Sequence, residues 1–157
     1  MKTLLLCILA STLSIFAQQS AEQDNEWFYA NYLEIMDPIR HENLEASSQI
    51  DILVGLWQRY QSDELIGPQY VAFLVEAFLH HPTATMQAFA KQDEQLFNTF
   101  CTTLAQLAKQ DDCDNHEVLI EFKDQVTTED ISGLTDDAEQ STFLAKLKSV
   151  VEDFPEL

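Results

Sequence analysis

Gln69-Tyr70-Val71-Ala72-Phe73-Leu74-Val75-Glu76-Ala77-Phe78-Leu79-His80 is a helix-length segment whose side chains are apolar on nearly every side. Only Glu76 interrupts the apolar run between Val71 and Leu79. A helix that is apolar all round belongs in the centre of a bundle, with neighbours on several sides. Gly67-Pro68 precedes the segment and Pro82 follows it, and a proline disfavours helical geometry in the residue before it. The sequence therefore predicts a central helix over 69–80.

Helical spacing of apolar residues recurs on both sides of this segment, whereas strand signals are scarce. Asp37-Pro38 is predicted to stop the first helix, because a proline forbids smooth continuation. The segment from Pro38 to Ser48 fits a short helix or a loop. Further along the chain, Asp93 is predicted to cap the helix that begins at residue 94. The remaining predicted helices cover residues 22–36, 49–61, 83–91, 94–109, 116–126 and 136–153.

These elements predict an all-α fold, a single domain over 18–157 with about six or seven short antiparallel helices. Gln49-Ile50, Gln69-Tyr70 and Gln95-Leu96 open three successive apolar helices. On this pattern alone, residues 49–109 loosely resemble a helix-pair array of the HEAT or armadillo type. The spacings between the three pairs are unequal and the pairs share no motif, which argues against a true repeat. An orthogonal bundle and a HEAT-like helical array therefore both stay open.

A signal-peptide pattern precedes the predicted domain. Lys2 supplies a positive charge, the residues from Leu4 to Phe16 are mainly apolar, and Ala17 offers a small residue before a polar segment. The apolar stretch is too short to span a bilayer, which needs about 20 residues as a helix. We expect residues 1–17 to be a cleaved signal peptide, with Ala21 as the alternative cleavage point. The protein is then secreted or periplasmic, without stable membrane insertion.

The charge balance limits the classes of partner. The chain has 27 acidic and 8 basic residues, a net charge of −19, and loss of Lys2 with the signal peptide makes it −20. Such a charge repels nucleic acid and anionic membrane surfaces. The sequence therefore predicts no nucleic-acid binding, and it favours a cationic protein or peptide as the partner.

Two cysteines, Cys101 and Cys113, remain after removal of Cys7 with the signal peptide. An even number of cysteines in an exported chain favours a disulfide. We therefore predict a Cys101–Cys113 bond. The alternative is two unpaired thiols that pack as small apolar groups.

The motifs that carry catalysis are missing. There is no Gly-x-Ser-x-Gly elbow, no Gly-rich phosphate loop and no Cys-x-x-Cys pair, so neither an enzyme nor a cofactor is predicted. Glu76 and His80 are four residues apart on one helical face and could share a metal ion. A third ligand would have to come from His41, His116 or a distant carboxylate. The simpler interpretation is that His80 and His81 lie at the C-terminal end of the helix, where they interact favourably with the negative end of the helix dipole.

Aromatic residues crowd the first predicted helix, where Trp27 and Tyr29 lie about 200° apart at 100° per residue. One stripe cannot bury both, so one of them is predicted to be exposed as a binding residue. The sequence thus predicts a small exported acidic helical protein that acts by binding. The alternative is a metal-binding protein or metal-dependent enzyme centred on Glu76 and His80.

Overall fold

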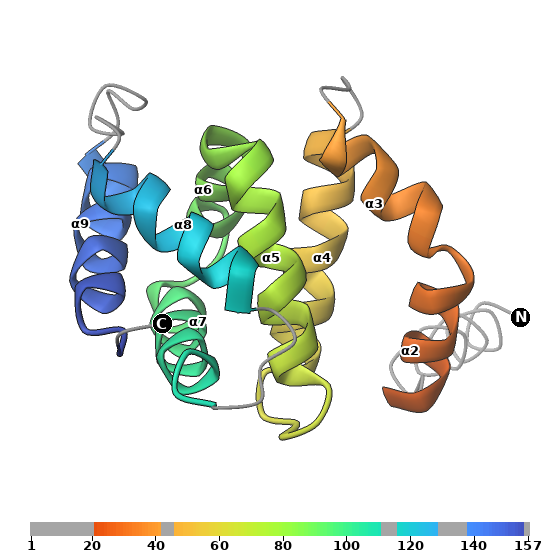
Figure 1. Ribbon diagram of the computed structural model, residues 1–157. Coiled ribbons are helices and arrows are strands. Elements are labelled where there is room, and N and C mark those ends of the chain that lie inside the picture. Colours follow the sequence, from red (N-terminus) through yellow and green to blue (C-terminus); the bar gives the residue numbers. More distant parts are fainter. Residues whose placement is uncertain (1–20, 42–45, 111–115, 129–137, 156–157) are drawn as a thin grey trace, which may run out of the picture. The chain divides into compact units, whose positions relative to one another are not determined.

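The computed structural model describes residues 21–41, 46–110, 116–128 and 138–155, and it is helical throughout, with no strand in those ranges (Figure 1). The predicted all-α bundle is confirmed, whereas the predicted signal peptide over 1–17 lies outside the described residues. The described helices are α2 (Ala21–Ala30), α3 (Tyr32–Arg40), α4 (Ala46–Tyr60), α5 (Gly67–His80), α6 (Pro82–Ala90), α7 (Glu94–Leu107), α8 (His116–Thr128) and α9 (Ala138–Glu152).

The chain divides into two compact units between Leu33 and Glu34. The first unit contains α2 and the start of α3. In it the ring of Phe28 is buried and meets Tyr29 and Tyr32 edge-on, with centroids 5.5 and 5.8 Å apart. The second unit contains the rest of α3 and the helices α4 to α9. The single domain predicted over 18–157 stays a prediction.

The first predicted helix is divided at Asn31, which separates α2 from α3. Asn31 donates from its side-chain Nδ2 to the Trp27 carbonyl at 2.7 Å, and its backbone N–H is shared between the Trp27 and Phe28 carbonyls. A side chain that competes for a helix carbonyl in this way weakens the helix. The predicted stop at Pro38 was wrong, because α3 includes that proline and runs on to Arg40.

Helix α5 is central in the second unit, as predicted, and packs against α4, α6, α7 and α8 (Figure 1). Its apolar side chains are distributed to several neighbours rather than to one face. The Phe78 ring meets Phe122 of α8 at 5.2 Å, and the Tyr70 ring stacks on Tyr60 of α4 at 6.2 Å. Gln125 of α8 also donates to the Leu79 carbonyl at 3.2 Å. These contacts explain why α5 is apolar nearly all round.

A second set of buried rings connects four helices of the same unit. The Phe100 ring of α7 lies 5.0 Å from Phe89 of α6 and 6.5 Å from Trp57 of α4. One turn earlier, Phe97 lies 4.5 Å from Phe143 of α9. All five side chains are at most 3% exposed. We refer to these five residues as the aromatic core.

Most helix boundaries follow the signals in the sequence. Asp93 caps α7, as predicted, because its side chain accepts the Leu96 N–H at 2.8 Å. The segment predicted as helix over 116–126 is helical and forms α8. Helix α4 begins three residues earlier than predicted, at Ala46. No helix in the described ranges is both long enough and apolar enough to cross a membrane.

Gly67, the first residue of α5, allows that helix to begin against the end of α4. A Cβ atom at Gly67 would lie 3.1 Å from the Tyr60 carbonyl oxygen and 3.5 Å from Cζ3 of Trp57. Gly55, in the middle of α4, has nothing within 4 Å of the same added atom. The two glycines therefore differ in the space around them and form a matched pair.

We expect Gly67→Ala to lower the free energy of unfolding by about 1 kcal/mol, because the new methyl group presses on a backbone oxygen. Gly55→Ala should instead raise it by about 0.5–1 kcal/mol, since alanine is the better helix former. Urea denaturation at constant m-value measures both changes. Equal stabilisation by the two substitutions would contradict the close approach at Gly67.

Candidate functional site

Glu76, the first predicted metal ligand, is held by an arginine. Its carboxylate accepts two hydrogen bonds from Arg40 of α3, from Nε at 2.6 Å and from Nη2 at 3.2 Å. A two-point pair of this kind is among the stronger side-chain interactions, because both partners are charged and their geometries match. A metal ion at Glu76 would have to displace the guanidinium. The pair links α3 to the central helix α5.

His80, the second predicted ligand, is exposed in the last turn of α5. The fold brings no third ligand to it: within the described ranges, no three His, Cys, Asp or Glu side chains are grouped so as to hold a metal ion. The next residue, His81, is the C-cap of α5, and its backbone N–H donates to the Ala77 carbonyl at 2.8 Å. His81 is also the N-cap of α6. The geometry thus favours a helix end over a metal site.

Trp27 and Tyr29, the predicted binding residues, are both partly exposed, at 44% and 50%. The sequence predicted exposure for one of them. Both belong to the first unit, where the Tyr29 ring also contacts Phe28. That they contact a partner stays a prediction.

Cys101 is a free thiol in the structure, so the predicted Cys101–Cys113 disulfide is not formed there. Cys113 itself lies outside the described residues. Helix α7 carries the chain about 9 Å beyond Cys101 before it ends at Leu107, so a bond would require the following residues to run back along the helix. Bridged cysteines need Cα atoms within about 7 Å. Cys101 is 2% exposed, and burial raises the pKa of its thiol to about 12, against a smaller lowering by Lys146.

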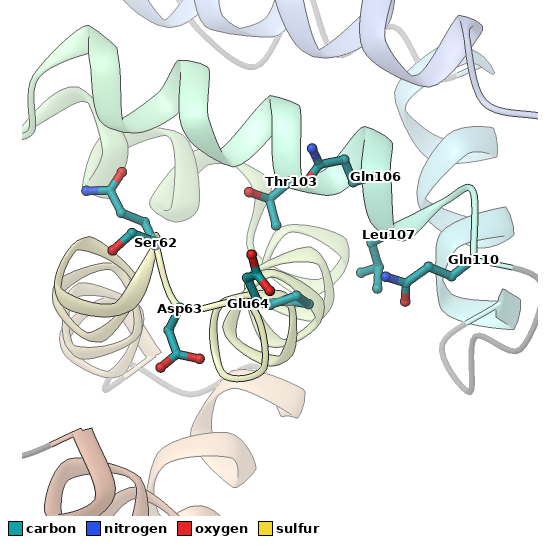
Figure 2. A pocket seen from close by; sticks show the side chains of 9 residues that line it. Ser62, Asp63, Glu64, Thr103, Gln106, Leu107 and Gln110 are labelled. Carbon is teal, nitrogen blue, oxygen red and sulfur yellow. The ribbon is translucent and has the colours of Figure 1, made fainter.

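A pocket of about 280 Å³ lies between the α4–α5 turn and the C-terminal half of α7 (Figure 2). We call it the turn pocket. Its lining includes two carboxylates and no Lys, Arg or His side chain. The lining residues are Gln61, Ser62, Asp63, Glu64, Pro68, Thr103, Gln106, Leu107 and Gln110.

Asp63 fixes the shape of the turn on one side of this pocket. Its Oδ1 accepts the backbone N–H groups of Leu65 and Ile66, each at 2.9 Å. The bond from Ile66, and then that from Leu65, hold the pKa of the Asp63 carboxyl below its ordinary value. The Asp63 carbonyl also accepts the Gly67 N–H at 3.0 Å. This residue therefore has a structural role in addition to its charge.

Glu64 and Leu65 are the side chains of the turn that are free to meet a ligand. In Figure 2 the Glu64 carboxylate is turned toward the side of α7 that carries Thr103, whereas Asp63 points away from that helix. Glu64 is exposed and makes no hydrogen bond or ion pair with the described residues. Leu65 is 80% exposed, the most exposed of the large apolar side chains in the described ranges.

The two carboxylates decide the sign of the electrostatic potential in the turn pocket. The C-terminal ends of α4 and α7 meet there and add partial negative charge, while the N-terminal end of α5 adds partial positive charge. Each helix end is equivalent to about half an elementary charge, so these contributions partly cancel. The full charges of Asp63 and Glu64 are left without a cation in the lining, and the pocket is negative.

Sequence reasoning missed the turn pocket, because it treated Ser62-Asp63-Glu64 only as a turn. One signal was available. Leu65 is an isolated large apolar residue between polar turn residues and Gly67-Pro68. An apolar side chain at such a place has no helical stripe to join, which favours exposure.

Comparison with protein-family models, with curated proteins and with solved structures finds no match to this chain.

We expect Cys101 to resist thiol reagents in the folded protein. In a Cys7→Ser, Cys113→Ser variant, disulfide exchange with Ellman's reagent at pH 8 should be on the order of 10³-fold slower in buffer than in 6 M guanidinium chloride, because burial suppresses the thiolate. Equal rates in the two solvents would contradict a buried thiol. Detection of a linked Cys101–Cys113 peptide by non-reducing mass spectrometry of the unaltered protein would show instead that the disulfide forms.

Asp63 should contribute to stability only where its carboxyl is ionised. Its pKa is lower in the folded chain than in the unfolded chain, so its contribution is complete above the unfolded value, about 3.9, and is lost as the pH falls through the folded value. Asp63→Asn should therefore be less stable than the parent at pH 6, and the difference should shrink below pH 4. Urea midpoints across this range measure it, with Glu64→Gln as the control of equal charge. A difference that stays constant down to pH 2 would refute this role.

Proposed function

We propose that this protein acts by binding a cationic, amphipathic segment of another protein or a peptide, and that the turn pocket receives it. The observation that carries the proposal is a pocket whose lining has two carboxylates and no cation, while Leu65, the residue after Glu64 in the turn, is highly exposed. A negative pocket beside an apolar side chain is complementary to a segment that carries both basic and apolar residues. The net charge of −19 steers cationic molecules toward the protein from a distance.

The side chains around the pocket have different roles in this proposal. Glu64 forms the ion pair with a lysine or arginine of the partner, since its carboxylate has no partner among the described residues. Leu65 supplies an apolar contact that becomes buried on binding. On the opposite wall, Thr103 and Gln106 of α7 and Gln110, just beyond its end, offer hydrogen-bonding groups.

Export and the aromatic residues of α2 complete the proposal. The pattern of residues 1–17 supports secretion or a periplasmic location. The sequence has no recognised catalytic motif that would favour an enzymatic role instead. Trp27 and Tyr29 are proposed as additional contacts in the first unit, because both are partly exposed and aromatic side chains are common at binding surfaces.

Titration calorimetry with a synthetic lysine–leucine amphipathic peptide tests the proposal. We expect binding that weakens about 10-fold between 50 and 300 mM NaCl, because exposed charges are screened by salt. Glu64→Gln and Leu65→Ser should each weaken binding by about 3- to 10-fold. The same peptide with glutamine in place of every lysine should bind much more weakly.

Glu94→Gln is the matched control. It removes the same charge from an exposed position at the opposite end of α7, about 14 Å along the helix from Thr103. This variant should change the affinity by less than about 2-fold, since only long-range attraction is lost. Affinity that is independent of salt, or that falls as much in Glu94→Gln as in Glu64→Gln, would refute binding at the turn pocket.

A further inference from the structure

A second pocket, of about 510 Å³, lies between α7 and α9, on another face of α7 from the turn pocket. We call it the lysine groove. Helix α7 contributes positions spaced by three or four residues, which share one side of the helix, and α9 contributes two positions one turn apart. Its lining includes Asn98, Cys101, Ala105, Lys109, Lys146 and Val150.

The charge of this groove is opposite to that of the chain. Acidic residues outnumber basic ones by more than three to one, yet the charged side chains that line the groove are Lys109 and Lys146, with no carboxylate. Two other cations of the described residues are paired with carboxylates: Arg40 binds Glu76, and Lys91 binds Asp51 at 2.7 Å. Neither lysine of the groove forms an ion pair with any residue in the described ranges. Two cations that have no ion-pair partner among the described residues therefore face one pocket.

The positions of the two lysines suit a ligand that enters from solvent. Lys109 is exposed at the C-terminal end of α7, while Lys146 is half-buried and donates a hydrogen bond to Oδ1 of Asn98. This neutral acceptor orients the ammonium group and leaves its charge uncompensated. The charge of Lys146 also acts on the Cys101 thiol, so the ammonium lies near the floor of the groove.

Besides the lysines, the lining has three polar residues, Asn98, Thr102 and Gln106, and an apolar part that is suited to an apolar chain. Cys101, Ala105 and Val150 present small apolar surface, and Cys101 is buried beneath the groove as a neutral thiol. A bare inorganic anion would leave this surface in contact with water. An anion with an apolar chain would cover it, which adds hydrophobic stabilisation in proportion to the area removed from water.

We propose that the lysine groove is a binding site for a small amphipathic monocarboxylate, with the carboxylate at Lys109 and Lys146 and its apolar chain along Ala105, Val150 and Cys101. The volume lies within the usual range for small-molecule sites, about 300–1,000 Å³. The groove shares only Gln106 with the turn pocket, which is negative and would repel such a ligand.

Sodium octanoate, titrated into the ¹⁵N-labelled full chain and followed by NMR, tests this assignment. We expect saturable shifts at the amides of Ala105 and Val150. Octanamide, which has the same chain without the charge, and inorganic phosphate, which has charge without a chain, should each bind at least about 10-fold more weakly. Lys109→Gln and Lys146→Gln should each weaken octanoate binding by about 5-fold or more and leave octanamide binding unchanged.

Lys148→Gln is the control, because it removes the same charge from α9 two residues beyond Lys146, at a position outside the lining. It should alter octanoate affinity by less than about 2-fold. If Lys146→Gln does not fold, Lys109→Gln, at an exposed site, decides the question alone. Equal binding of octanoate and octanamide, equal binding of octanoate and phosphate, or equal losses in Lys148→Gln and Lys109→Gln would each overturn the assignment.

Discussion

The aromatic core fixes the position of α7, and both pockets depend on that helix. Phe97 and Phe100 reach Trp57, Phe89 and Phe143, so one face of α7 is bound to α4, α6 and α9 together. Aromatic pairs contribute about 0.5–1.5 kcal/mol beyond their buried area, and they have preferred ring geometries that restrict rotation of the helix. With that face fixed, the remaining faces of α7 have fixed directions. One lies toward the α4–α5 turn, another borders the lysine groove beside α9, and Gln106 lines both pockets.

The central helix α5 explains why Glu76 is structural. A helix with neighbours on several sides places its one acidic residue beside apolar surface, where a lone carboxylate is costly. Arg40 neutralises it with two hydrogen bonds and joins α3 to the bundle. Loss of either partner would leave the other charge partly buried without compensation, which costs more than the pair contributes. Glu76 and His80 do lie one turn apart on α5, as their spacing predicts. Glu76, however, pairs with Arg40, and His80 lies at the end of the helix.

Periodicity predicted most of the fold because each of α4 to α9 carries its own apolar pattern, and local signals such as the Asp93 cap depend on neighbours in the chain. It failed where a single polar atom decided the outcome, as at Asn31, whose side chain competes for a carbonyl. The Cys101–Cys113 bond was predicted from the expected compartment, whereas the packing of α7 buries Cys101 as a free thiol. The isolated Leu65 could indicate an exposed turn but not a pocket, because Glu64 and Thr103 are distant in the chain and only the packing of α7 brings them together.

Distance decides how two pockets of opposite sign can work on one strongly acidic protein. At physiological ionic strength, interactions between exposed charges fade over about 8 Å. Within that range the side chains of each pocket dominate, so Lys109 and Lys146 present a positive surface although the whole chain is negative. Beyond it, the residual field attracts cations and repels anions. A cationic partner is therefore favoured both on approach and in contact, whereas an anion gains only in contact. The apolar lining of the lysine groove supplies an attraction that is independent of this field, which is why we assign it an amphipathic ligand rather than a simple ion.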